Sequence, residues 1–184
     1  MKRAWILTAF GKDRPGIVAR LTKILYEQGC NLEDSAMTRL AGEFAIMLIV
    51  SAESSLSQGR LERACKPLSQ DHRLIVHLKA LTRSELARVS HGKPYLISVY
   101  GADRPGIVYR VSELLARLGV NITDVATHRT AGKAGPRATS LYLMLLEIEL
   151  PPRLQAARLE RQLIRLTRQL GVDVSLRSTE THVL

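Results

Sequence analysis

The sequence predicts an α+β protein made of two tandem units, each with the element order β-α-β-β-α-β. The first observation is a repeat: Gly11–Val18 returns ninety residues later as Gly101–Val108, with one difference in eight positions. About half of the paired positions from Gly11 to Gly42 are identical at this one offset. The second observation is that strand-like and helix-like apolar patterns follow one another in the same order in both halves. A duplicated ferredoxin-like domain is therefore expected, with antiparallel sheets and helices on one face of each sheet.

The first half begins with a strand, a helix and a more polar strand. Residues Ala4–Phe10 alternate as a strand does. Pro15 is expected to open the helix that follows, because proline suits the first helical position, and Gly29 to close it as a C-terminal cap. The next strand, Asn31–Leu40, ends at a tight turn, Ala41–Glu43.

The first half ends with an apolar strand, a second helix and a closing strand. The apolar strand is Phe44–Val50, and the helix begins at Ser54 or Ser55. Pro67 lies inside the helical pattern and should kink or end it, because proline removes a helical hydrogen bond. The strand Leu74–Leu78 closes the unit.

The second half repeats this order. Its expected elements are, in sequence, Tyr95–Tyr100, Pro105–Leu118, Asn121–Thr130, Thr139–Glu149, Pro152–Leu170 and Val172–Arg177. Residues 1–81 are therefore assigned to the first domain, 82–93 to a linker and 94–184 to the second domain. Extra residues at Lys133–Thr139 lengthen the second hairpin and are expected to form an exposed loop.

Composition limits the cellular setting and the partners. The formal net charge of +10 makes nucleic acid a partner to consider. No apolar run reaches the roughly eighteen residues that a membrane span needs, so no membrane partner is expected. Cys30 and Cys65 are not at equivalent positions and have no metal-binding spacing. We expect two free thiols and a cytoplasmic protein.

The third strand of each unit bears on assembly. Both Phe44–Val50 and Leu141–Leu146 are apolar on both sides of the strand. In a sheet with helices on one face only, such a strand should alternate between apolar and polar residues. We therefore expect the other face to be covered by the second unit or by another chain, in a homodimer or larger assembly.

The repeated segment has the chemistry of a small-anion site. The first-turn amides of Gly16, Ile17 and Val18 have no acceptor inside the helix and point out of its positive end. A carboxylate could bind there, and Gly16 has no side chain to keep it away. Asp13 could accept from a ligand ammonium, and Asn31 could present one donor and one acceptor, which together suit an α-amino acid. The alternative is that Asp13 and Asn31 only order their loops.

The segments Asp13–Val18 and Gln28–Asp34, inside a βαββαβ unit, resemble the ACT domain, and the resemblance covers both halves. ACT domains are small regulatory modules that usually bind amino acids at the interface between two copies. The tandem pair, with Gly29–Ser35 and Leu74–Lys79, resembles the glycine cleavage system transcriptional repressor family. The ligand-binding positions that this resemblance implies are Asp13, Arg14, Pro15, Gly16, Ile17, Asn31, Asp103, Arg104, Pro105, Gly106, Ile107 and Asn121.

The resemblance implies a regulator with glycine, or another small amino acid, as its ligand. It also implies a protein partner, a DNA-binding transcriptional activator whose action is blocked depending on glycine. The residues themselves show no catalytic pair or triad, no nucleotide-binding glycine motif and no metal-ligand spacing among the five histidines. We therefore expect no enzyme activity, no cofactor and no metal. An ACT subunit that acts in trans on a metabolic enzyme is an alternative.

Direct DNA binding is the other competing interpretation. The last helix carries four arginines at i, i+3, i+7 and i+10, roughly opposite its leucines: Arg158, Arg161, Arg165 and Arg168. Such a stripe could follow a line of phosphates, or it could be a solvated helix face. No segment resembles a helix-turn-helix, and an aromatic content of 4% provides no stacking platform for bases.

Overall fold

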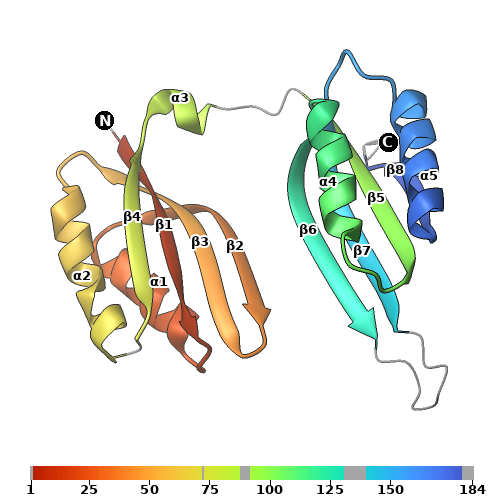
Figure 1. Cartoon of the computed structure of the whole chain (residues 1–184). Coiled ribbons are helices and arrows are strands. Elements are labelled where there is room, and N and C mark those ends of the chain that lie inside the picture. Colours follow the sequence, from red (N-terminus) through yellow and green to blue (C-terminus); the bar gives the residue numbers. More distant parts are fainter. Residues whose placement is uncertain (1, 72, 88–91, 131–139, 180–184) are drawn as a thin grey trace, which may run out of the picture. The chain divides into compact units, whose positions relative to one another are not determined.

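The computed structural model describes residues 2–71, 73–87, 92–130 and 140–179. The chain divides into two compact units, Met1–Arg88 and Val89–Leu184. Each unit is an α+β sandwich with a four-stranded antiparallel sheet, so the predicted fold class is confirmed (Figure 1). The hairpin insertion expected at Lys133–Thr139 lies outside the described residues.

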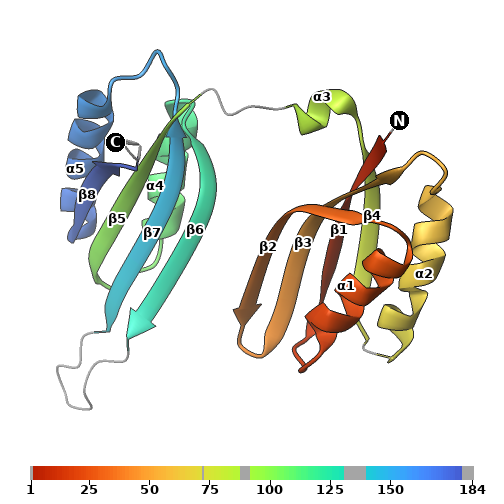
Figure 2. The ribbon, with the colours of Figure 1, turned by 180° about the vertical axis from the view of Figure 1, so that it is seen from behind.

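The first unit has the sheet order β2-β3-β1-β4. Its elements are β1 (Lys2–Lys12), α1 (Ile17–Glu27), β2 (Asn31–Leu40), β3 (Glu43–Glu53), α2 (Gln58–Asp71) and β4 (Ile75–Leu81). The central strand β1 pairs with both β3 and β4. This order leaves β2 and β4 at the two edges of the sheet (Figure 2).

One apolar core joins the helices of the first unit to one face of the sheet. Leu7 and Leu48 from the central strands lie in the same buried cluster as Leu21 from α1 and Leu61 from α2. Each of these side chains is almost fully removed from water. The alternation of the strands therefore directs one set of side chains towards both helices, as predicted.

The second unit repeats this arrangement with the sheet order β6-β7-β5-β8. Its elements are β5 (Lys93–Ala102), α4 (Ile107–Arg117), β6 (Asn121–Thr130), β7 (Leu141–Leu150), α5 (Ala156–Leu170) and β8 (Val172–Ser178). Its core again joins strands and helices, with Ile97 and Met144 packed in one cluster with Val111 of α4 and Leu159 of α5.

A short helix, α3 (Arg83–Leu86), lies in the stretch that we assigned to the linker. Thr82 and Glu85 form a capping box: the Thr82 hydroxyl accepts from the Glu85 amide, and the Glu85 carboxylate accepts from the Thr82 amide at 2.8 Å. The spacing Thr-x-x-Glu was visible in the sequence and is a helix-start signal. Lys93, also assigned to the linker, is the first residue of β5.

Two of the prolines that we placed in helices, Pro15 and Pro67, show where the helix bounds differ from expectation. Helix α1 begins at Ile17 with Gly16 as its N-cap, so Pro15 precedes the helix instead of opening it. Pro67 neither ends nor divides α2, which continues to Asp71. The buried Leu61 and Leu68 flank Pro67 in the same core cluster. Their burial holds both halves of α2 on the sheet and offsets the roughly 3 kcal/mol that a proline costs inside a helix.

The sheet of the first unit is open on the side away from its helices. Phe10, Met47 and Ile75 are 46%, 47% and 59% exposed, although all three are large and apolar. All ten residues of the edge strand β2 are exposed as well. Among the described residues, no helix has the length and apolar character required to cross a membrane.

Candidate ligand site before the first helix of each unit

Both repeated loops end in a glycine whose backbone only glycine adopts readily. Gly16 is the N-cap of α1 with φ of 90°, and Gly106 is the N-cap of α4 with φ of 93°. A Cβ placed on either glycine would meet no atom within 4 Å. The conformation of the backbone, and not a lack of space, therefore requires glycine here.

The start of each helix offers backbone donors. Neither N-cap glycine has a side chain to satisfy the first-turn amides. In the first unit, the Ile17 amide makes only a long hydrogen bond of 3.4 Å to the Arg14 carbonyl. The side chains of Ile17 and Ile107 are buried in the two cores, so these two site residues can offer a ligand only their backbone. The result is a helix end that suits a small anion.

Each loop aspartate is paired with an arginine. Asp13 Oδ2 lies 3.3 Å from Arg39 Nη1, and Asp103 Oδ2 lies 2.8 Å from Arg129 Nε. The Asp13 amide also donates to the Gly42 carbonyl. These contacts give the aspartates the loop-ordering role that we had left open beside ligand binding. They also bring an exposed guanidinium to each loop.

Sequence reasoning missed Arg39 and Arg129 as site residues. They occur at equivalent positions of the repeat, and that identity was the available signal. A guanidinium carries five donors in a fixed fork and suits a carboxylate. The loop therefore combines backbone amides with an arginine, which strengthens the interpretation of an anion site.

Asn31 lies far from this loop within its own unit. It is the first residue of β2, whereas Arg39 is near the end of the same strand, eight residues on and about 26 Å away. Asn31 Nδ2 donates to Glu33 Oε1 at 3.0 Å, and the Ser51 hydroxyl donates to the same carboxylate. These two bonds lower the pKa of Glu33. One unit alone therefore does not bring Asn31 and Asp13 together.

The arginines and prolines of the repeated loop are at the surface, and one of the arginines also contacts a helix. Arg14, Pro15, Arg104 and Pro105 are all exposed. Arg104 Nη1 donates to the Leu170 carbonyl at 3.4 Å, which places a cation at the C-terminal end of α5. That position stabilises the helix end. Arg104 therefore contacts α5 as well as belonging to the candidate ligand loop.

The second unit has a polar group that the first lacks. Strand pairing places Tyr142 opposite Gly101 and Phe44 opposite Gly11, so tyrosine replaces phenylalanine at equivalent positions. The Tyr142 hydroxyl is buried and has no hydrogen-bond partner among the described residues. Burial, followed by the nearby Asp103 carboxylate, raises the pKa of Tyr142. The two sites therefore differ in a residue close to the loop aspartate.

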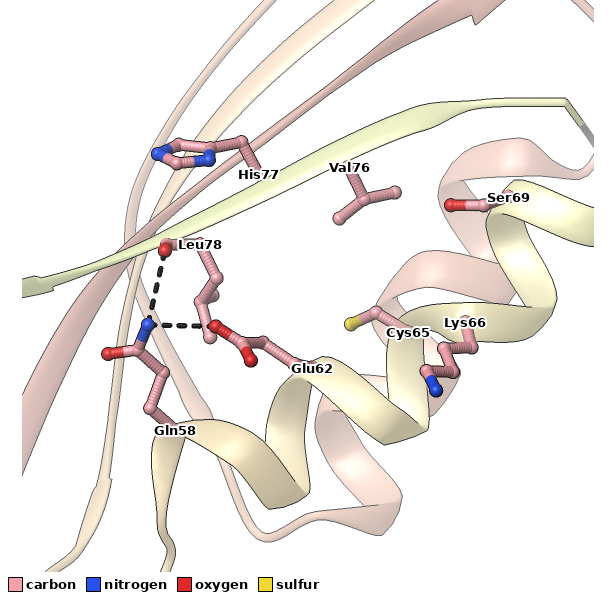
Figure 3. Close-up of a pocket in the computed structure, with 8 residues that line it drawn as sticks. All are labelled: Gln58, Glu62, Cys65, Lys66, Ser69, Val76, His77 and Leu78. Atoms are coloured by element: carbon pink, nitrogen blue, oxygen red, sulfur yellow. Dashed lines mark hydrogen bonds between the residues drawn. The ribbon is translucent and has the colours of Figure 1, made fainter.

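A hollow of about 430 Å³ lies elsewhere, between α2 and the edge strand β4 (Figure 3). Gln58 bridges it by donating to Glu62 at 2.8 Å and to the Leu78 carbonyl at 3.4 Å. Burial raises the pKa of Cys65, which also lines the hollow, to about 11, so its thiol is a poor nucleophile at neutral pH. No predicted site residue lines this hollow.

Two of the residues that line this hollow, Cys65 and Lys66, differ in character from their counterparts in the second unit. Helices α2 and α5 begin at equivalent residues, because the amides of Arg60 and Arg158 donate to Ser57 and Gln155 in the same way. Cys65 and Lys66 then stand where the second unit has leucine and isoleucine.

Within the residues that the structure describes, no three histidine, cysteine or acidic side chains are placed to hold a metal ion.

Both units match a known protein family. Residues 4–79 and 93–177 each match the family model for the ACT domain. Over 174 residues the chain is 29% identical to the glycine cleavage system transcriptional repressor of Escherichia coli (strain K12), covering 93% of this chain and 87% of that protein.

Two solved structures have the same fold. An unknown protein from Galdieria sulphuraria superposes with a TM-score of 0.83 at 24% identity, over 97% of this chain and 99% of that one. A crystal structure that carries the provisional name glycine cleavage system transcriptional repressor gives a TM-score of 0.71 at 20% identity, over 98% and 99%. At these identities the likeness establishes the fold alone.

Proposed function

The chain belongs to the ACT domain family, and on that premise we propose that it is an amino-acid-responsive regulator that represses glycine cleavage genes in response to glycine. The observation that supports this most is the intact loop in both units, with a glycine N-cap and an aspartate–arginine pair. An α-amino acid has the complementary groups: a carboxylate for the helix end and an ammonium for the aspartate. The repressor from Escherichia coli supports the choice of glycine.

We propose that the ligand site is completed by the edge strand of a second copy of the domain. Asn31 and the Asp13–Arg39 pair lie at opposite ends of the same exposed edge strand. Two such edges placed antiparallel bring Asn31 of one strand to the Arg39 end of the other, because the strands run in opposite directions. The exposed apolar sheet face of the first unit also suits an assembly. We propose a homodimer or larger oligomer on these grounds.

Regulation would pass through a protein partner. The ligand site contains backbone amides and paired charges, and it contains no group with the reactivity of a catalytic nucleophile. A bound amino acid could instead change the surface that a DNA-binding activator contacts. Binding of glycine and contact with such an activator are separate parts of the proposal and are tested separately.

Calorimetry of the full chain with each of the twenty amino acids tests the first part. We expect glycine to bind, and a ligand at a hundred times its dissociation constant to add about 2.7 kcal/mol to the free energy of unfolding. If no amino acid binds at millimolar concentration, the sensor function is wrong.

A gel shift of glycine cleavage promoter DNA, with and without a purified activator, tests the second part. A shift by the chain alone that is specific to promoter DNA, absent with a duplex of unrelated sequence and unaffected by the activator, would contradict regulation through a partner.

A further inference from the structure

Helix α5 presents a line of arginines to solvent. Arg158, Arg161, Arg165 and Arg168 are all exposed, and they extend over ten residues, or about 15 Å of helix. Leu159 and Leu163 on the opposite side are fully buried and fix the orientation of the helix. Within the residues that the structure describes, no acidic side chain forms an ion pair with any of the four arginines.

Helix α4 adds a fifth arginine beside this line. A hollow of about 170 Å³ between the two helices is lined by Leu114, Arg117, Gln162, Arg165, Leu166 and Gln169. Arg117 and Arg165 therefore approach the same space from two helices, and the two glutamines add further donors. We call Arg117, Arg158, Arg161, Arg165 and Arg168 the arginine face.

The first unit shows that the fold does not require these charges. Equivalent hydrogen bonds at Ser57 and Gln155 begin helices α2 and α5, so their residues can be matched one by one. The five positions of the arginine face correspond to Glu27, Arg60, Arg63, Pro67 and Gln70. Arg60 is also engaged, since its Nε donates to Gln28 at 3.1 Å. Two arginines and a glutamate thus stand where the second unit has five arginines.

The chemistry of the arginine face favours phosphate over an acidic protein surface. Protein interfaces have an apolar centre, but α5 exposes no large apolar side chain. The large exposed apolar residues of α4, Val108 and Tyr109, lie in its first turn, away from Arg117 in its last turn. Neutralising a line of phosphates requires only cationic side chains. The face has no aromatic residue on which unpaired bases could stack, which favours the backbone of a duplex as the target.

We propose that the arginine face binds the phosphate backbone of duplex DNA without reading its sequence. This goes beyond the proposed function, in which the regulator acts through a protein partner. The arginine face would add a direct contact between the regulator and the DNA to which that partner binds. Phosphate contacts fix position and add affinity but carry no sequence information. The contact and the amino-acid site are built from different residues.

Fluorescence anisotropy of the full chain with a labelled 30-base-pair duplex of unrelated sequence tests this. The slope of log affinity against log salt is about −0.9 per neutralised phosphate, so contacts by the four arginines of α5 alone predict a loss of about 150-fold between 50 and 200 mM salt. Removing two contacts with Arg161→Gln/Arg165→Gln should reduce this to about 12-fold. No binding by the unaltered chain at 50 mM salt would overturn the proposal.

The first unit provides a matched control. Arg60→Gln/Arg63→Gln removes the same charge from α2, at the positions that match Arg158 and Arg161 of α5, and should leave the salt slope unchanged. An equal loss in both double variants would mean that only net charge matters, and the arginine face would then have no special role. Tighter binding of poly-L-glutamate than of the duplex at equal charge concentration would assign the face to an acidic protein surface and contradict the proposal.

Two further readouts keep the outcome interpretable. Thermal unfolding should be the same for both double variants, and Arg158→Gln/Arg168→Gln provides a second pair if Arg161→Gln/Arg165→Gln unfolds early. Glycine binding measured by calorimetry should be unchanged in every variant. Loss of DNA binding with glycine binding intact would support the arginine face independently of the amino-acid site.

Discussion

Asp103 and Arg129 form an ion pair in which Oδ2 and Nε are 2.8 Å apart, and each unit has such a pair at the same place. The arginine side chains are about 70% exposed, so each pair contributes little to the free energy of unfolding. Its effect is on position: it ties the loop that leads into the first helix to the edge strand. The guanidinium is thereby held beside a loop that can bind an anion.

Asp13→Asn with Asp103→Asn should separate ligand binding from loop order. Asparagine keeps an acceptor for the arginine but loses the charge that attracts an ammonium. We expect glycine affinity to fall about tenfold, or about 1.4 kcal/mol, while the free energy of unfolding changes by less than about 1 kcal/mol. Calorimetry gives the first value, and urea unfolding followed by circular dichroism gives the second. Unchanged glycine binding together with earlier unfolding would mean that the aspartates only order their loops.

Gly16→Val should reduce stability through the backbone. A left-handed conformation costs a residue with a side chain about 1–2 kcal/mol, and a β-branched residue is at the upper end. The space around Gly16 is open, so Gly16→Asn, which tolerates this conformation, should fold nearly normally. Its side chain would still lie at the helix end and weaken glycine binding.

The chain contains a reporter for this experiment. Trp5 is the only tryptophan and is buried in the core of the first unit, so its fluorescence follows the unfolding of that unit. Gly59→Ala is the control, because Gly59 lies in α2 with free space around it and no left-handed backbone. That variant should be stabilised by about 0.5 kcal/mol. A valine at position 16 that costs nothing would contradict the backbone argument.

Helix α3 should stay capped in acid. Hydrogen bonding from the Thr82 backbone, followed by Lys79 and the Thr82 hydroxyl, lowers the pKa of Glu85 from 4.5 to about 2. A lowered folded-state pKa means that the contribution of Glu85 is fully present above pH 4.5 and is lost as pH falls through about 2. An NMR titration of the Glu85 carboxyl carbon checks this. Thr82→Ala should raise the midpoint, and a midpoint near 4.5 in the unaltered chain would contradict the capping box.

The fold could be predicted from the sequence because the duplication shows the residue pattern of each helix and strand twice. Strands β2 and β6 have the predicted bounds, since a glycine-ended helix precedes both. The helix starts were predicted too early, at Pro15 and Pro105, because a glycine in a left-handed conformation can be the N-cap after a proline. Pro67 does not end α2, because buried leucines on either side hold the helix on the sheet, and their burial cannot be read from the local pattern alone.

The candidate site was only partly predictable. The loop residues follow from the repeat, but pairing of Asp13 with Arg39 depends on how β2 runs back past the loop. The separation of Asn31 from that loop depends on the length of the same strand. The sequence pattern identifies Asp13 and Asn31 as candidate site residues but does not show how far apart they lie.

Tyr142 provides the last prediction, because its hydroxyl is buried without a partner among the described residues and its counterpart is Phe44. Removing a buried polar group that makes no hydrogen bond should be neutral or stabilising, so Tyr142→Phe should raise the free energy of unfolding by zero to about 1 kcal/mol. The reverse change in the first unit, Phe44→Tyr, adds a hydroxyl to a side chain that is only 3% exposed and should cost about 1–3 kcal/mol. Trp5 fluorescence in urea follows Phe44→Tyr, and circular dichroism follows Tyr142→Phe. A destabilised Tyr142→Phe would show that the hydroxyl has a stabilising partner in solution, and weaker glycine binding in the same variant would place that hydroxyl in the second ligand site.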